Sequence, residues 1–299
     1  MKRIFFITAV LFVIFRSILP AQDLDKLLGN IDVDNTSNYV YGTFKGTTII
    51  NGQSVEVPGR KDLQFLISHR FGAVNTGLYN FFGLDQATTR LGLEYGIADI
   101  LSVSIGRSTY EKTYDGGIKV KVLRQQTGIK NMPLTMSVYC AGFVETTKWE
   151  DPERDNLFSS RWSFSTQLLI ARKFSKNLSL QISPSYVHIN LVPTAADQNN
   201  IYSVGFGGRY KLTSKFSINS EYYYLLPGET ANDYANSLSF GVDIETGGHV
   251  FQLHFTNSQL MYTPGYIART EGKWSEGDIF IGFNIFRIFS LSRKGKSKS

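Results

Sequence analysis

The chain has 299 residues and a single cysteine, Cys140, so a scaffold held together by internal disulfides is excluded. Its 31 Lys and Arg against 25 Asp and Glu give a formal net charge of +6. The positive surplus lies at the two ends, within residues 2–16 and 293–298. Because the body of the chain is nearly neutral, the sequence carries no nucleic-acid footprint, and we expect no nucleic-acid partner.

The first 21 residues predict a cleaved signal peptide. Lys2 and Arg3 precede an apolar stretch over residues 4–15, and the small residue Ala21 offers a cleavage site. Arg16 interrupts the apolar stretch, which makes a retained membrane helix the weaker reading. We therefore expect export, with residues 1–21 removed and a short N-terminal segment, residues 22–62, left at the start of the mature chain.

Residues 63–289 repeat one pattern, in which about ten alternating residues end at turn residues. About twelve such runs follow in order: 63–72, 88–97, 101–110, 115–124, 133–145, 161–173, 178–190, 200–212, 216–226, 236–245, 249–258 and 277–289. Runs of this length are longer than the usual strands of a soluble sandwich. The pattern predicts an all-β protein, a transmembrane antiparallel up-and-down β-barrel of about twelve strands, followed by a basic tail over residues 290–299.

The links between these runs alternate in length. Short links are expected at 97–100, 128–132, 175–177, 213–215 and 246–248, and longer polar ones at 72–87, 146–160, 190–199, 227–235 and 259–276. The link at 109–114 fits neither group clearly. Short turns on one rim and long loops on the other are typical of outer-membrane barrels, whose termini lie on the periplasmic side. The predicted location is therefore the outer membrane, with lipid as the surrounding partner.

Alternation within the strands predicts which side chains face lipid. In residues 88–110, Leu91, Leu93 and Ile105 fall on one face, while Arg90 and Glu94 fall on the other. In a membrane barrel the apolar face contacts lipid and the charged face lines the lumen. Aromatic residues near the ends of the long loops, Trp149, Trp162, Trp274 and Tyr222 to Tyr224, are interpreted as an interfacial girdle.

Charged residues of both signs share the predicted lumen-facing parity. The candidates are Arg70, Arg90, Glu94, Arg107, Lys119, Lys121, Glu145, Arg209, Lys211, Glu221, Asp243 and Glu245. Mixed signs predict ion pairs between neighbouring strands, since an unpaired buried charge is costly. These charges either fill and rigidify the interior or line a solute path.

Arg107 is the exception among these candidates. Counting by twos from Leu101 places Arg107 on the lipid face. Either a bulge at Gly106 turns it inward, or its side chain snorkels at the rim. We favour the bulge, because Arg107 would then share a lumenal wall with Lys119 and Glu111.

A hairpin is predicted ahead of the first barrel strand. Residues 41–50 and 53–57 flank Asn51 and Gly52, the strongest short-range hairpin signal. The hairpin has too few residues to form its own core, so it must dock elsewhere. It either lies beneath the barrel or enters the lumen as a plug.

Signals for chemistry are weak. The four histidines, His69, His188, His249 and His254, are scattered, and none shares a nucleophile motif. Residues 32–37 begin like a calcium loop but lack its glycine and its final glutamate. We therefore predict no enzymatic activity, no catalytic residues, no metal site and no cofactor.

Several short segments resemble a known family. They are TFKGTT at 43–48, INGQSVE at 50–56, HRFG at 69–72, GLDQA at 83–87, GRS at 106–108 and KTYDG at 112–116. They are similar to an uncharacterised Gram-negative family of outer-membrane β-barrels, domain of unknown function 5777. The resemblance implies a barrel and supplies no ligand or activity.

Two functions are compatible with these features. The first is a passive pore or solute-uptake channel with a mixed-charge lumen, whose partner is a small solute. The alternative is a non-conducting structural or interaction barrel that serves a periplasmic or surface protein.

Overall fold

The computed structural model describes residues 37–128, 130–149, 151–228, 230 and 234–291. The predicted signal peptide, residues 22–36 of the N-terminal segment and residues 292–299 of the basic tail lie outside this described part.

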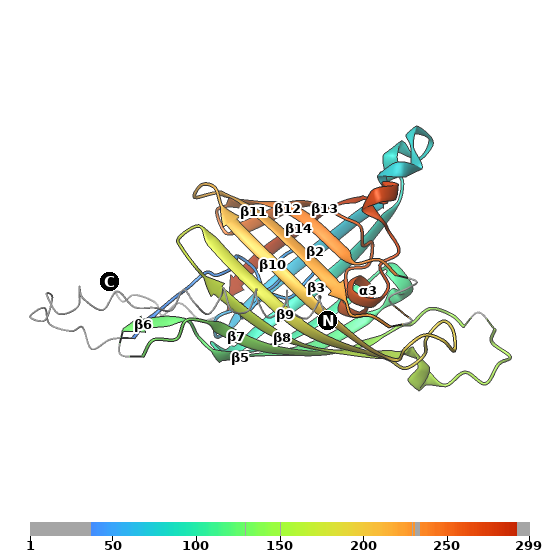
Figure 1. Ribbon diagram of the computed structural model, residues 1–299, viewed down its shortest axis with the longest axis horizontal. Helices are drawn as coiled ribbons and strands as arrows, with labels where there is room; N and C mark the ends of the chain where they lie inside the picture. The colour runs from blue at the N-terminus through green and yellow to red at the C-terminus, as the bar shows by residue number, and fades with distance from the viewer. Residues whose placement is uncertain (1–36, 129, 150, 229, 231–233, 292–299) are drawn as a thin grey trace, which may run out of the picture. The chain divides into compact units, whose positions relative to one another are not determined.

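Twelve antiparallel strands form a closed barrel (Figure 1). They are β2 (Asp62–Ala73), β3 (Ala87–Ala98), β4 (Leu101–Ser108), β5 (Tyr114–Leu123), β7 (Thr135–Val144), β8 (Trp162–Lys173), β9 (Leu178–Ile189), β10 (Asn200–Lys211), β11 (Phe216–Leu225), β12 (Ser237–Thr246), β13 (His249–Thr256) and β14 (Phe280–Ser290). Each strand pairs with its neighbours along the chain, and β14 pairs with β2 to close the sheet. The predicted twelve-stranded up-and-down barrel is confirmed.

Alternation sorts the side chains of each strand into an outer and an inner face. Leu91 and Ile105 are 49% and 63% exposed, whereas Ser102 is fully buried and Glu94 is 8% exposed. The same contrast recurs around the barrel, so its outside is apolar and its inside polar. Such an exterior suits lipid rather than water. No helix among the described residues is long and apolar enough to span a membrane.

Arg107 corrects one prediction. It pairs with Leu91 in the β3–β4 ladder, and that ladder runs without a bulge at Gly106. Arg107 is therefore exposed on the outer wall, where its guanidinium lies 5.3 Å from the centre of the Tyr114 ring. The neighbouring residue, Gly106, faces the lumen instead. It lies beside the charge pair of Arg90 and Asp115, which leaves no room for a side chain at this position.

The two rims of the barrel differ. One rim carries the short turns, and the other carries the long connections with the 3-10 helices η1 (Val74–Thr76), η2 (Leu78–Gly83), η3 (Tyr110–Lys112), η4 (Phe158–Arg161) and η5 (Trp274–Glu276). One connection departs from the predicted pattern. The β5–β7 link, expected as a short turn, carries β6 (Gln126–Gly128), which pairs with β1 (Ser37–Tyr39) outside the barrel (Figure 1).

The lumen is filled from both rims. Residues 40–59, here called the plug, enter the barrel between β1 and β2, and Val55 at their centre is fully buried. From the opposite rim, the β13–β14 connection, residues 257–279 and here called the inward loop, folds into the barrel mouth and carries α3 (Thr263–Ala268) (Figure 1). Every residue of α3 is buried. The long connection predicted at 259–276 is present, but its first half, including Leu260 and Tyr262, is apolar and buried rather than polar. Tyr223, assigned to the aromatic girdle, also faces the lumen and is 3% exposed.

Candidate functional site

The inner wall pairs its charges across an intervening strand. Arg90 on β3 and Asp115 on β5 approach to 2.5 Å, and β4 lies between these two strands. Gly106 of β4 makes room for the pair, because a Cβ there would lie 2.3 Å from Nη2 of Arg90 and 2.7 Å from the Asp115 carboxylate. This steric demand explains the glycine at this position of β4.

Further pairs follow the same rule. Lys119 of β5 lies 3.6 Å from Glu94 of β3, and Ser102 of the intervening β4 donates a hydrogen bond to Glu94 at 2.6 Å. Arg209 of β10 lies 3.2 Å from Glu245 of β12. Ion pairs between directly neighbouring strands were expected; the wall instead pairs charges two strands apart, over a small residue that leaves space for both side chains.

The remaining predicted lumenal charges take different positions. Arg70, Glu221 and Asp243 are buried in the lumen. Lys211, at the end of β10, is half-buried. Glu145 lies just beyond β7 at the long-loop rim, where its backbone carbonyl accepts a hydrogen bond from Arg161 at 3.1 Å.

Glu221 holds the tip of the plug. Its carboxylate accepts hydrogen bonds from three consecutive backbone amides, those of Ile50 at 3.1 Å, Asn51 at 2.7 Å and Gly52 at 3.0 Å. Arg70 donates to the Asn51 side-chain oxygen at 2.6 Å. Hydrogen bonds to a buried carboxylate are stronger than neutral ones, so this turn is firmly fixed.

Amide side chains of the wall bind the plug carbonyls. Gln252 donates to the Ile49 carbonyl at 2.7 Å, and Asn284 donates to the Ile50 carbonyl at 2.9 Å. Gln181 makes contacts of both kinds, since it accepts from the Val55 amide at 2.9 Å and donates to the Gln53 carbonyl at 2.7 Å. The two arms of the plug bond to each other near the turn, where the Ile49 amide donates to Gly52 at 2.8 Å and the Ser54 amide donates to Thr47 at 2.9 Å, as the predicted hairpin requires. Many of the other backbone groups of the plug find their partners in the wall.

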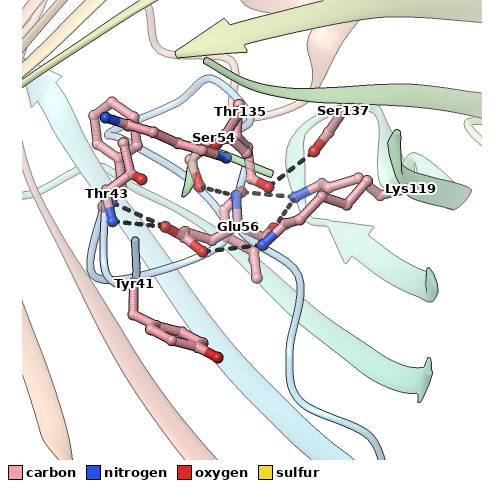
Figure 2. A network of polar contacts seen from close by, with 12 residues as sticks. Tyr41, Thr43, Ser54, Glu56, Lys119, Thr135 and Ser137 are labelled. Atoms are coloured by element: carbon pink, nitrogen blue, oxygen red, sulfur yellow. Dashed lines mark hydrogen bonds and ion pairs between the residues drawn. The ribbon is translucent and has the colours of Figure 1, made fainter. Parts of the chain in front are cut away.

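The base of the plug is fixed by lysines of β5 (Figure 2). Lys119 donates to the carbonyls of Thr47 at 2.9 Å and Glu56 at 3.1 Å, and Lys121 lies 3.4 Å from the Glu56 carboxylate. The same carboxylate accepts the Thr43 amide at 2.8 Å. Glu56 therefore joins the two arms of the plug to each other and to the wall.

Apolar side chains complete the closure. Phe44 and Val55 of the plug belong to one buried cluster with Phe143 of the wall and with Leu260 and Tyr262 of the inward loop. A cavity of about 20 Å³ lies where plug and inward loop approach each other. This volume has room for about one water molecule, so the plug and the inward loop leave little free space between them.

The inward loop is held at the rim by the cluster of Glu111, Tyr262 and Arg269, here called the rim latch. The Glu111 carboxylate accepts hydrogen bonds from the Tyr262 hydroxyl and from both terminal nitrogens of Arg269. Burial raises the pKa of Tyr262 well above its usual range, and the charge of Glu111 raises it further. Tyr262 therefore stays a neutral donor at physiological pH.

Two larger cavities lie at the long-loop rim, outside the closure. Their volumes are about 520 and 550 Å³, and both are lined by Glu145, Arg154 and Leu191. Arg269 of the rim latch also lines the first of them. A solute entering from this rim would meet the inward loop before the plug.

Several residues of the site were not singled out by the sequence. Asp115 shares its parity with Lys119, so alternation could have identified it. The side-chain amides of Gln181, Gln252 and Asn284 also have lumen-facing parity, but they are uncharged and were therefore not selected. Alternation gave no indication for Arg269, because this residue lies in a connection and not in a strand. In the described part of the chain, no group of three or more His, Cys, Asp or Glu residues is placed to hold a metal ion.

An apolar exterior, a polar interior and twelve closed strands define a membrane β-barrel. A family model described as a membrane bound beta barrel domain (DUF5777) matches residues 44–289. The chain belongs to this family. A search of curated proteins found no match.

Solved structures with similar folds include porins. The NanC porin has 12% sequence identity and a TM-score of 0.47, with 77% of this chain and 100% of that chain covered. The KdgM porin has 10% identity and a TM-score of 0.42, with 77% and 99% covered. The outer membrane protein Omp33 of Acinetobacter baumannii has 8% identity and a TM-score of 0.41, with 77% and 98% covered. At these values, the similarity says nothing about a solute of this chain.

Proposed function

We propose that this protein is a solute-uptake channel of the outer membrane whose lumen is closed by its own N-terminal plug. Its short-turn rim, where both ends of the plug meet the barrel, would face the periplasm. In this proposal the charged wall residues line a solute path once the plug has left, and the protein acts as a channel rather than an enzyme.

The proposal is carried by the way in which the plug is attached. Most of its polar contacts join plug backbone to wall side chains such as Glu221, Gln181 and Gln252. If the plug withdraws, water can replace these backbone groups, because every wall partner is already a polar group suited to hydration. A purely structural interior would gain more from apolar packing than from a charged wall.

A deletion tests the proposal. Removing residues 23–59 should leave a folded barrel whose single-channel conductance lies clearly above that of the intact protein. Folding is checked independently by migration on gels before and after boiling. Lys45→Ala is the matched control, because Lys45 meets Glu245 at 2.5 Å through a partly exposed pair, so its loss should leave the plug in place and the current low.

The alternative is the non-conducting interaction barrel, and one observation favours it. The lumen is closed twice, by the plug and by the inward loop, and the two meet in one apolar cluster. Near-zero current in the intact protein, in the deleted protein and in the deleted protein with Glu111→Ala, which frees the inward loop, would support this alternative and a periplasmic or surface protein as partner, provided that folding is retained.

A further inference from the structure

We propose that the plug occupies a peptide-binding site, so that the solute class of this channel is short peptides with free backbone amides. This inference rests on the proposed function, because it names the class of solute that would bind where the plug now lies. The segment of this chain that occupies the site is the plug tip, residues 49–52 with the sequence Ile-Ile-Asn-Gly.

The wall recognises the peptide backbone at successive positions. Glu221 accepts the amides of residues 50, 51 and 52, while Gln252 and Asn284 donate to the carbonyls of residues 49 and 50. Donors and acceptors of the wall thus complement both the amides and the carbonyls of a peptide. Continued contacts to Val55 from Gln181 and Ser137 extend this recognition along the second arm.

These wall groups are themselves buried and held by other wall residues. Gln252 is 2% exposed and also donates to Asp243 at 2.8 Å, and Asn284 is fully buried and donates to Gln252 at 2.7 Å. The site therefore has partners within the wall that fix its orientation.

The tip position adds a restriction on shape. A Cβ on Gly52 would lie 1.8 Å from the Tyr223 hydroxyl oxygen, so the site accepts glycine there. The Asn51 side chain adds contacts with Arg70 at 2.6 Å and Ser239 at 3.1 Å. A peptide that ends in Asn-Gly therefore fits better than a sugar of equal size, which has hydroxyls but no amides in this order.

The test uses the full-length protein and reports binding without requiring transport. A single cysteine, Thr48→Cys in a Cys140→Ser background, is placed on the plug. Thr48 is 9% exposed and its hydroxyl has no hydrogen-bond partner, so the change removes no bond. The labelling rate with a water-soluble maleimide then measures how often the plug leaves. Ser54→Cys, at a fully buried plug position, serves as a second reporter if the first variant folds poorly.

The probe is the capped peptide acetyl-Ile-Ile-Asn-Gly-amide. It should compete with the plug and raise the labelling rate several-fold at saturation. A matched ester analogue, in which oxygen replaces the amide N–H groups of Asn and Gly, removes two donors to the Glu221 carboxylate and should be at least about tenfold less potent. A trisaccharide of similar mass should leave the rate unchanged.

Glu221→Gln supplies the positive control, because one carboxylate oxygen is exchanged for an amide donor and the plug should loosen without any peptide. The peptide site is refuted if Glu221→Gln raises the labelling rate while the peptide leaves the labelling rate of the protein with intact Glu221 unchanged. If peptide, ester and trisaccharide act alike, recognition of amides is refuted. If Glu221→Gln leaves the plug fully protected, the anchoring role of Glu221 is refuted. A peptide effect with no current in any form would retain the site and refute the channel.

Discussion

The plug and the inward loop close the same lumen by different means. The plug is held by its backbone, which bonds to buried polar groups of the wall such as Glu221. The inward loop forms its own short helix, α3, packs through apolar side chains such as Tyr266 and Ile267, and is tied at the rim by Glu111. The helix of the inward loop satisfies much of its own backbone, whereas the plug hairpin bonds internally next to its turn and relies on wall side chains for many of its other backbone groups. The plug is therefore the closure whose loss changes the wall most.

The largest effect is expected at Glu221. Glu221→Ala leaves three plug amides without this acceptor and removes a buried carboxylate that interacts electrostatically with Arg70. We expect a loss of roughly 3 kcal/mol or more of stability, since unpaired buried groups are costly. The free energy of unfolding is measured by titration with urea, with the folded fraction determined from gel migration.

Glu245→Ala is the matched control for this experiment. Glu245 is an inward-facing carboxylate of the same lumen, but its side chain is 19% exposed. Water can replace its partners, so the loss should stay below about 1 kcal/mol. Equal losses for the two variants would show that the plug tip contributes no more than a rim contact, which would remove the contrast between the two closures.

A smaller effect is expected at the rim latch. Glu111→Ala should release the inward loop, with a loss of about 1–2 kcal/mol, because Arg269 is partly exposed and can be hydrated. The reporter is Ser258→Cys in the Cys140→Ser background, a fully buried position of the inward loop. Its maleimide labelling should accelerate, while labelling of Thr48→Cys in the plug should stay slow.

Lys112→Ala, on the exposed neighbour of Glu111, should leave both labelling rates unchanged. If Glu111→Ala accelerates labelling of the plug as strongly as that of the inward loop, the two closures open together and their separate chemistry has no functional consequence.

The barrel could be predicted from the sequence because each strand carries its own local signal. Alternation in the run that became β4, for instance, assigns Ser102 inward and Ile105 outward without knowledge of any partner. The same rule gave the correct outward parity for Arg107, and the added hypothesis of a bulge led to the error.

The closures could not be predicted in the same way, because they depend on contacts between distant segments. Asn51 and Glu221 are 170 residues apart, and nothing local in either stretch indicates that they meet. The inward loop did carry a signal, since Leu260, Met261 and Tyr262 are unusual in an exposed loop. Pairing of Arg90 with Asp115 across β4 depends on the stagger of three strands, which alternation does not specify.

The smallest effect separates the closures by pH. The pKa of the Tyr262 hydroxyl in the rim latch is raised in the folded protein. When the inward loop is released, the same hydroxyl ionises at a lower pH, about the ordinary tyrosine value of 10. The contribution of Tyr262 to stability is thus fully present below about pH 10 and is lost as the pH rises through the higher folded-state value.

Labelling of Ser258→Cys is impractical at such pH, so the ionisation of tyrosine is measured instead, by ultraviolet absorbance. The titration curve of Tyr262→Phe is subtracted from that of the intact protein. The difference should show one tyrosine that ionises above pH 10. Tyr79→Phe, at a 95% exposed position outside the rim latch, is the control substitution. A difference curve for Tyr262 centred at pH 10 would mean that the inward loop is not latched in solution, and only the plug would then close the lumen.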